Sequence, residues 1–294
     1  MHADHPRRYL MCRPTYFTVS YEINPWMDRS RPVDTPLAVA QWERLRDTYR
    51  DLGHTVETID PVPGLPDMVY AANGATVVDG LVYSARFLHP ERAAEGPAYL
   101  KWFADHGFVT HLAEQVNEGE GDLLVAGDVV LAGTGFRTDR AAHAEAAALW
   151  GREVVTLELV DPRFYHLDTA LTVLRGNQGG PVPDGGAHPA LVGPPAVDVT
   201  YYPDAFSPAA QEILRERFPD ALLATEEDAV VLGLNAVSDG THVVHNPRAE
   251  HLAGALRERG YEPLGVDTSE LLRGGGGAKC CTLEMRGLRA GGAA

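Results

Sequence analysis

A glycine run near the end of the chain leads into two adjacent cysteines, and this stretch is the strongest chemical signal in the sequence. It reads RGGGGAKCCTLEM from Arg273 to Met285 and contains two of the three cysteines of the protein. Glycines allow the backbone to turn sharply and approach a ligand closely, so a thiol behind them can face a pocket. A cysteine in such a place can act as a nucleophile once its pKa is lowered. We expect Cys280 to be that nucleophile, whereas Cys281, on the opposite face of an extended strand, and Cys12 should pack in the core.

Groups that could assist a cysteine nucleophile stand just ahead of other apolar segments. A histidine can protonate a leaving group and then deprotonate water, and carboxylates can hold a cationic substrate and orient the imidazole. His166 and Asp168 are two residues apart, which places them on one face of an extended segment. Each motif alone also fits a structural role, such as a solvated acidic turn. The candidates are Glu118 and Glu120 in NEGEGDLL, His166 and Asp168 in FYHLDTAL, and Asp67 and Asn73 in LPDMVYAANGA.

Two rival kinds of site lack their usual sequence patterns. A zinc site would need paired ligands at spacings such as Cys-x-x-Cys or His-Glu-x-x-His, and the sequence has neither. The GGGGAK stretch is not followed by the Gly-Lys-Ser/Thr of a phosphate-binding loop. We therefore expect thiol chemistry that requires no metal or other cofactor.

The composition limits the partners and the compartment. A formal net charge of -16 argues against nucleic acid or an anionic membrane as a partner, because both need a basic face. The same charge is compatible with a small cationic substrate. Three cysteines do not make a disulfide framework, and we find no signal peptide and no membrane-spanning run, so we expect a cytoplasmic protein.

The elements that must position these residues recur along the chain. Residues 74–112, 121–159 and 234–267 each suggest a hairpin with an Asp-Gly or Gly-Asp turn, then a helix, a glycine and another strand. The helices close near Gly107, Gly151 and Gly260, as expected of residues just past a helix end. Two weaker copies complete the set. One is a hairpin with a long Gly/Pro-rich loop at 170–186 followed by a helix and strand at 209–225, and the other is a helix and strand at 36–60.

A closed ring accounts for these copies better than an open array. The repeat spacing of roughly fifty residues falls in the range of propellers and solenoids. The N-terminal copy lacks a hairpin, and AKCCTLEM at 278–285 could supply its missing strand. We therefore predict a five-bladed α/β propeller with its site at the centre, in preference to a two-domain α/β protein. We expect residues 1–294 to form a single catalytic domain, with flexible tails at about 1–7 and 288–294.

The same motifs resemble the guanidino-group-modifying enzymes, or amidinotransferase superfamily, which have a five-bladed α/β propeller fold. The resemblance extends from MCRPTYFTVSYEINPWM at 11–27 to GGGGAKCCTLEM. It implies that Cys280 attacks a guanidinium carbon to give a covalent amidino-thioether, that His166 is the acid/base and that Glu118 is the catalytic acidic residue. The family pattern is acid-Gly-Gly-Asp, whereas this chain has one more residue, so Glu120 stays an alternative.

The resemblance also implies roles in substrate binding. Asp168 resembles the aspartate that binds the guanidinium, and Asp67 is a further candidate for the pocket. Arg86 and Arg137 resemble the arginines that grip a substrate carboxylate, a task that suits their bidentate geometry. The partner implied is a small guanidino compound, arginine or a methylated arginine, and a homo-oligomer is possible.

Position 73 suggests the subfamily. Deiminases and dimethylargininases usually have an aspartate there, whereas this chain has Asn73, which together with Asn24 in YEINPWM is most similar to the arginine dihydrolases. A carboxylate favours a cationic guanidinium over a neutral ureido group, whereas a neutral amide discriminates less between the two. Citrulline could therefore be kept in the site for a second attack. The expected activity is hydrolysis of arginine to ornithine through citrulline. A dimethylargininase or arginine deiminase is the alternative, followed by an amidinotransferase and a non-catalytic arginine sensor.

Overall fold

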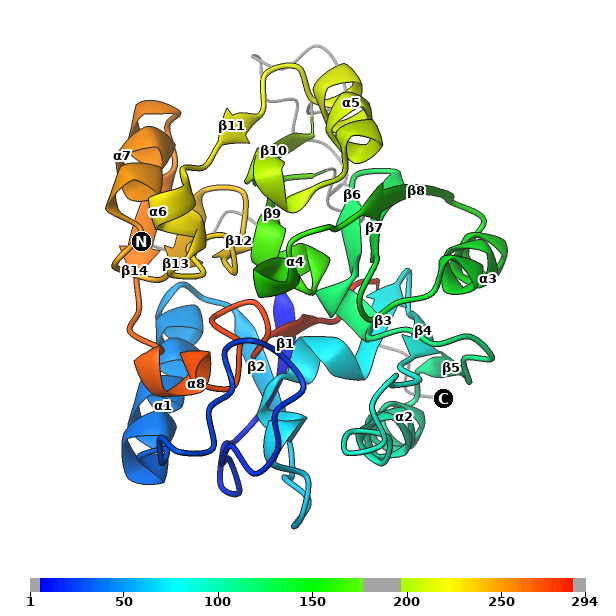
Figure 1. Ribbon diagram of the computed structural model, residues 1–294. Helices are drawn as coiled ribbons and strands as arrows, with labels where there is room; N and C mark the ends of the chain where they lie inside the picture. Colours follow the sequence, from blue (N-terminus) through cyan, green and yellow to red (C-terminus); the bar gives the residue numbers. More distant parts are fainter. Residues whose placement is uncertain (1–5, 177–196, 288–294) are drawn as a thin grey trace.

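Five three-stranded sheets follow one another around a common centre in a computed structural model that describes residues 6–176 and 197–287 (Figure 1). In every sheet the middle strand pairs antiparallel with one neighbour and parallel with the other. Written as antiparallel partner, middle strand and parallel partner, the sheets are β15 (Leu283–Glu284), β1 (Arg8–Cys12) and β2 (Thr55–Ile59); β3 (Ala75–Val78), β4 (Leu81–Ser84) and β5 (Val109–His111); β6 (Leu123–Ala126), β7 (Val129–Thr134) and β8 (Glu153–Glu158); β9 (Leu171–Arg175), β10 (Asp198–Tyr201) and β11 (Leu222–Leu223); and β12 (Val237–Ser238), β13 (His242–His245) and β14 (Glu262–Gly265).

The first sheet takes its inner strand from the other end of the chain. Tyr9 of β1 lies opposite Glu284 of β15, so the C-terminal segment completes the unit that lacks a hairpin of its own. This arrangement confirms the predicted five-bladed α/β propeller. The sequence motif AKCCTLEM does supply the closing strand, but only Leu283 and Glu284 are in strand conformation.

A helix connects the middle and outer strands of each unit and lies at the rim (Figure 1). Helix α1 shows how the sequence builds one. Asp34 caps its N-terminus by accepting a bond from the backbone of Leu37, and its apolar stripe, which includes Trp42 and Tyr49, is buried. Helix α3 ends at Gly151, whose φ of +62° is the left-handed conformation expected at a helix end. The rim helices are α1 (Thr35–Asp51), α2 (Glu95–Asp105), α3 (Arg140–Trp150), α5 (Pro208–Arg217) and α7 (Glu250–Glu258).

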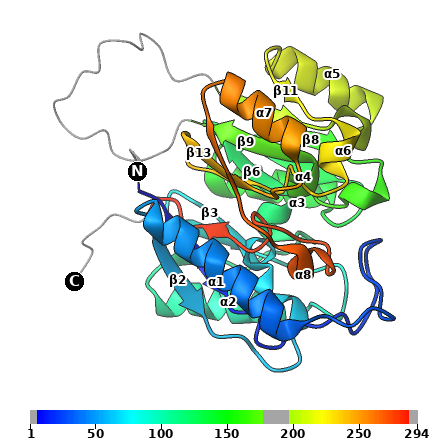
Figure 2. The same ribbon diagram turned by 90° about the vertical axis from the view of Figure 1, so that its left-hand side faces the viewer.

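Short turns precede the inner strands and point the chain toward the centre. Turn η2 (Ala71–Gly74) precedes β3, η3 (Gly119–Gly121) precedes β6, and α4 (Leu167–Ala170) precedes β9. Figure 2 shows the dark blue segment between β1 and α1 on the same side of the molecule as α8. The other short helices are η1 (Pro66–Val69), η4 (Pro162–Phe164), η5 (Pro203–Ala205), α6 (Glu226–Ala229) and α8 (Ser269–Leu272).

Parts of three predicted segments lie outside the described residues. They are residues 1–5 and 288–294 of the predicted tails and the stretch 177–196, which includes most of the predicted Gly/Pro-rich loop. Arg7, which the sequence assigns to the N-terminal tail, is anchored. Its carbonyl accepts a bond from Thr55, and its guanidinium donates to Glu284 at 3.2 Å.

Candidate active site

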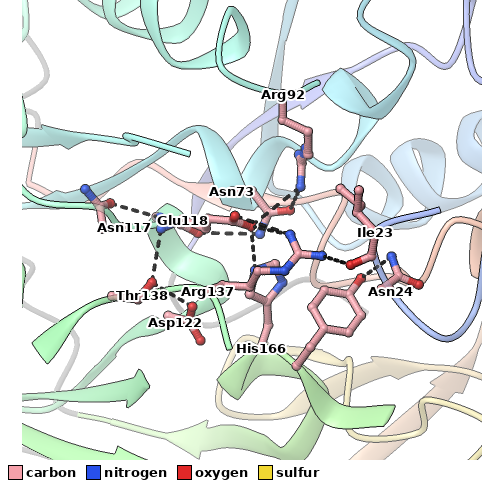
Figure 3. Close-up of polar contacts among 12 residues, drawn as sticks. Ile23, Asn24, Asn73, Arg92, Asn117, Glu118, Asp122, Arg137, Thr138 and His166 are labelled. Carbon is pink, nitrogen blue, oxygen red and sulfur yellow. Dashed lines mark hydrogen bonds and ion pairs between the residues drawn. The ribbon is translucent and has the colours of Figure 1, made fainter. Parts of the chain in front are cut away.

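A buried carboxylate, Glu118, holds a histidine and an arginine together at the centre of the propeller (Figure 3). Nε2 of His166 donates to Oε2 of Glu118 at 2.8 Å, and Nη1 of Arg137 donates to both carboxylate oxygens at 3.1 and 3.2 Å. Burial alone would raise the pKa of Glu118, but Arg137, His166 and Arg92 outweigh it and hold that pKa well below its usual range. Glu118 is therefore an anion that fixes the imidazole of His166 with its Nε2 proton toward the carboxylate and leaves Nδ1 free.

Arg137 also binds the segment that follows β1. Its Nη2 donates to the carbonyl of Ile23 at 2.8 Å, and its guanidinium carbon lies 4.7 Å from the ring centre of Tyr165. The next residue, Asn24, donates to the carbonyl of Gly274 at 3.0 Å and to the hydroxyl of Tyr165 at 3.3 Å. Asn24 therefore links this segment to the start of the glycine run.

The glycine run is glycine-rich because two tyrosines pack directly against its backbone. A Cβ at Gly274 would lie 2.2 Å from the hydroxyl of Tyr70, and one at Gly276 would lie 2.4 Å from the ring of the same tyrosine. Gly275, at a φ of +94°, would meet the hydroxyl of Tyr165 at 2.5 Å. Side chains on these glycines would displace the loop that carries the cysteines, which is the close approach expected from the sequence.

Cys280 points into the charged centre, as predicted, but the physical reason given by the sequence was wrong. Cys280 and Cys281 lie in a turn before β15 and not in a strand, so the turn, and not strand alternation, separates the two side chains. The thiol of Cys280 donates to Oδ2 of Asp168 at 3.3 Å and accepts a bond from Nδ2 of Asn235 at 3.1 Å. Cys281 packs in an apolar cluster with Tyr49 and Tyr70.

The electrostatics of the site keep the proton on the sulfur. Burial, followed by the carboxylate of Asp168, raises the pKa of the Cys280 thiol well above its usual range. Burial raises the pKa of Asp168 to about 7, although Lys279 opposes this shift. A cation bound beside these two groups would lower both pKa values, so this pair is suited to a cationic substrate.

The second buried arginine at the site is Arg92, whereas Arg86, which the sequence proposed, lies outside the buried cluster. Arg86 is exposed and donates to the carbonyl of Glu114 at 2.6 Å. Arg92 is buried, donates to Oδ1 of Asn73 at 3.0 Å, and forms a bidentate pair with Glu95 at 3.0 and 2.8 Å. The stretch ARFLHPER at 85–92 contains both arginines. An available signal was the i, i+3 pair of Arg92 and Glu95 at the start of α2, because such pairs meet on a helical turn.

The sequence left open whether Glu118 or Glu120 is the acidic residue of the site, and the geometry distinguishes between them. Glu118 touches His166, whereas Glu120 turns away and binds Lys279 at 2.6 Å, the backbone of Glu284 at 3.0 Å, and Arg286. Glu120 therefore links the turn before β6 to the turn that carries Cys280.

Three buried polar atoms at this centre have no hydrogen-bond partner in the described part of the chain. They are Oδ1 of Asp67, Nδ1 of His166 and Oδ1 of Asp168. The other carboxylate oxygen of Asp67 accepts a bond from the hydroxyl of Tyr21 at 2.8 Å. Because buried polar groups normally have partners, these atoms are candidates for bonds to a substrate. Within residues 6–176 and 197–287, no group of three or more His, Cys, Asp or Glu side chains could hold a metal ion.

Similar sequences come from enzymes named for the hydrolysis of arginine or dimethylarginine. The N(G),N(G)-dimethylarginine dimethylaminohydrolase of Mycobacterium tuberculosis is 53% identical over 279 residues, which cover 95% of this chain and 86% of that protein. The bifunctional arginine dihydrolase/ornithine cyclodeaminase ArgZ of Synechocystis sp. is 34% identical over 285 residues, which cover 95% of this chain and 37% of that protein. The chain belongs to the guanidino-group-modifying enzymes. No family model matches the sequence.

Solved structures of this enzyme family share the fold. The product-bound N-terminal domain of ArgZ superimposes with a TM-score of 0.85 at 34% identity, covering 95% of this chain and 97% of that one. A dimethylarginine dimethylaminohydrolase adduct, at 16% identity, has the same fold with a TM-score of 0.71. The present member is a hydrolase that acts on C–N bonds of amidines. None of its described helices is long and apolar enough to cross a membrane.

Proposed function

We propose that this enzyme hydrolyses L-arginine to ornithine, two molecules of ammonia and carbon dioxide, consuming two waters, with citrulline as the bound intermediate. Cys280 is the nucleophile, His166 the acid/base and Glu118 the carboxylate that orients His166. Asp168, Asp67 and Asn73 face the guanidino group, and Asn24 closes the site from the segment after β1. The whole chain, 1–294, acts as one catalytic domain. The free state of Cys12, Cys280 and Cys281 supports a reducing cytoplasm.

The orientation of Asn73 is the observation that carries the ornithine-forming proposal. Its Oδ1 accepts a bond from Arg92, and because an arginine can only donate, the amide cannot face the other way. Nδ2 donates one hydrogen to the carbonyl of Glu118 at 3.5 Å, so the part of Asn73 left for a ligand is the second hydrogen of Nδ2. This nitrogen lies beside Gly121, where a Cβ would meet Nδ2 at 2.4 Å and the ring of His166 at 3.3 Å. A guanidinium offers only donors, whereas the ureido group of citrulline carries an oxygen that accepts. Asn73 therefore favours retention of citrulline.

The first round of chemistry follows from the charges around Cys280. A guanidinium bound against Asp168 lowers the pKa of the thiol, so that the thiolate can attack the guanidinium carbon. The thiol proton passes to Nδ1 of His166, which then gives it to the departing ammonia as the C–N bond breaks and leaves an amidino-thioether on Cys280. Water then attacks the same carbon and gives a proton to His166, and the C–S bond breaks to release the sulfur and form citrulline.

The second round needs citrulline to stay aligned, because a ureido carbon is a poor electrophile. The donor of Asn73 can hold the ureido oxygen while Cys280 attacks again and the second ammonia leaves, which gives a thiocarbamate on the sulfur. Water then breaks the C–S bond, and the carbamate that is released loses carbon dioxide to leave ornithine. Arg137 is the candidate for the substrate α-carboxylate, with Arg92 as the second buried arginine in place of Arg86.

A dimethylarginine dimethylaminohydrolase is the second candidate. It is favoured by the 53% identity to the Mycobacterium tuberculosis protein of that name. Such an enzyme would release dimethylamine and stop at citrulline.

Product analysis separates these candidates. We expect the wild type to convert arginine to ornithine with two ammonia per arginine, measured by chromatography at low conversion. Citrulline as the sole product would replace this proposal with an arginine deiminase. Faster consumption of dimethylarginine, with release of dimethylamine, would favour the second candidate.

Two substitutions at position 73 test the role of its donor. In Asn73→Asp the new carboxylate pairs with Arg92 and the donor is lost, and in Asn73→Ala the donor is lost without a charge. Both variants should shift the product toward citrulline with one ammonia. If the product shifts toward citrulline only in Asn73→Asp, then the charge at position 73, and not its hydrogen-bond donor, controls the retention of citrulline.

A further inference from the structure

Each of the five units sends a polar residue to the centre from the turn before its inner strand, and in the fifth unit this residue is Asn235. Its side chain is 1% exposed and lies two residues before β12. Oδ1 of Asn235 accepts bonds from the backbone N–H groups of Gly277 at 2.9 Å and Cys280 at 3.0 Å. Nδ2 donates to the carbonyl of Asp168 at 3.1 Å and to Sγ of Cys280 at 3.1 Å.

The orientation of this amide is determined by its partners. Two backbone N–H groups can only donate, so they must face Oδ1, and the amide nitrogen must face the sulfur. Both acceptor positions and both hydrogens of the side chain are then used. The backbone adds support, because Asn235 accepts a bond from the N–H of Lys279 at 3.2 Å and donates to Leu232 at 3.1 Å. The amide is therefore rigidly aimed at the thiol.

We propose that Asn235 is a catalytic residue that stabilises the thiolate of Cys280 through a direct N–H···S hydrogen bond. The proposal rests on the role of Cys280 as the nucleophile. The hydrogen stays on Asn235, and its bond to sulfur becomes stronger when the sulfur carries a full negative charge. Asn235 thereby favours the reactive form of the nucleophile before and during attack.

The other groups around the thiol do not supply this donor. The titratable groups that influence its charge are Asp168, Cys281, Tyr70 and Tyr165, and Lys279 precedes it in the chain. Tyr70 and Tyr165 donate elsewhere, to the carbonyls of Leu271 and Gly275, and Lys279 is bound to Glu120. Burial and Asp168 raise the pKa of Cys280, and the bond from Asn235 opposes them.

Asn235 could instead only anchor the loop through Oδ1, and two isosteric variants distinguish these roles. Asn235→Asp keeps an acceptor for Gly277 and Cys280 but removes the donor to sulfur. Asn235→Leu removes donor and acceptor without adding a charge. A donor role predicts that both variants lose thiolate reactivity, the aspartate variant at least as much as the leucine variant. An anchoring role predicts that the leucine variant keeps the wild-type pH profile, because a displaced loop changes access to Cys280 and not its affinity for the proton. The carboxylate of the aspartate variant repels a thiolate under either role.

The measurement is the rate of Cys280 alkylation by iodoacetamide in the full chain without substrate, followed by mass spectrometry from pH 5 to 10. We expect the rate at pH 7 to fall about tenfold in Asn235→Leu, equivalent to a rise of about one pKa unit. Cys281→Ala, as a control, should keep the wild-type profile. If the leucine variant does not fold, Asn235→Ala takes its place.

An unchanged pH profile in the neutral variant, or wild-type reactivity in Asn235→Asp, would overturn the proposal. A failure of the nucleophile assignment gives a different result, because the wild type would then react at another residue. Substrate identity does not enter this measurement, so the product analysis stands independently of it.

Discussion

Among the residues that the structure describes, two buried clusters pair a histidine with a carboxylate, and they differ in whether the carboxylate oxygens have hydrogen-bond partners. At the centre, His166 bonds to Glu118 at 2.8 Å. Between the first and fifth sheets, Nδ1 of His242 donates to Asp239 at 2.8 Å, and Nε2 of His54 lies 3.3 Å from the same carboxylate oxygen. All of these side chains are nearly inaccessible to solvent.

In the outer cluster both carboxylate oxygens of Asp239 have partners. The other oxygen of Asp239 accepts bonds from the backbone of Thr241 and His242, at 2.8 and 2.7 Å. Nδ1 of His54 accepts a bond from the backbone of Arg7 at 3.2 Å, so its proton is on Nε2 and points at Asp239. The central cluster instead leaves Nδ1 of His166 and one oxygen each of Asp67 and Asp168 without partners among the described residues. A completed buried network indicates a structural connection, and an incomplete one indicates a place where a ligand supplies the missing bonds.

The largest expected effect tests whether the incomplete cluster is the reaction centre. Cys280→Ser should reduce turnover by at least about a thousandfold, because a hydroxyl is a far weaker nucleophile than a thiolate. The melting temperature should change little. Cys281→Ala, in the adjacent apolar cluster, is the matched control and should keep substantial activity. A trapped adduct on Cys281 in mass spectrometry would contradict the assignment.

The next effect tests which arginine belongs to the centre. Arg92→Ala removes the partner of Asn73 and leaves Glu95 buried without its cation, so we expect kcat/KM to fall by about a hundredfold or more. Arg86→Ala, six residues earlier on the exposed side, should stay within about twofold of the wild type. Steady-state kinetics of both variants decide this, and a larger loss in Arg86→Ala would restore the original prediction.

A substitution in the outer cluster should change the stability of the folded protein and not its catalytic rate. Its neighbours hold the pKa of Asp239 below its usual range, although burial opposes them. A carboxylate with a lowered pKa stabilises the folded state above its unfolded pKa, and this contribution is lost as the pH falls through the folded pKa. Asp239→Asn should therefore lower the stability at pH 7 by about 3 kcal/mol, the cost of losing hydrogen bonds to a buried carboxylate. The kcat of the folded fraction should be unchanged, and a variant that loses kcat without losing stability would remove the distinction between the clusters.

The smallest expected effect concerns the stability that the folded protein loses when the buried carboxyl group of Asp168 is ionised. The pKa of Asp168 is raised to about 7 by burial, so the folded state holds this proton more tightly than the unfolded state. Such a group destabilises the folded state as the pH rises from the unfolded value toward 7, and the cost is fully present above 7. Asp168→Asn should therefore raise the melting temperature at pH 8.5 by a few degrees relative to the wild type, and raise it less at pH 5. Calorimetry at the two pH values checks this prediction. An equal change in melting temperature at both would mean that the ionised carboxylate of Asp168 does not destabilise the folded state.

The sequence by itself determined the repeating unit. It also determined at which end of each unit the candidate catalytic residues lie. Asp79 and Gly80, both at positive φ, make the tight turn between β3 and β4, and this preference is local to the two residues. Apolar segments with regular turns define strands and helices by local periodicity in the same way. His166, Asp168, Asn73 and Cys280 were found because each occurs just ahead of an inner strand.

Only the tertiary structure decided which side chains meet. Glu118 and Glu120 are two residues apart in one turn, yet one binds His166 and the other Lys279. Arg86 and Arg92 stand in one irregular segment, where only the i, i+3 spacing of Arg92 and Glu95 separates them. Asn235 had no chemical signal in the sequence beyond its place in the repeat. These contacts join residues from different sheets, so they depend on how the five units pack around the centre. Local preferences fix the backbone of each unit, but the packing of one unit against the next fixes which of its polar groups point inward.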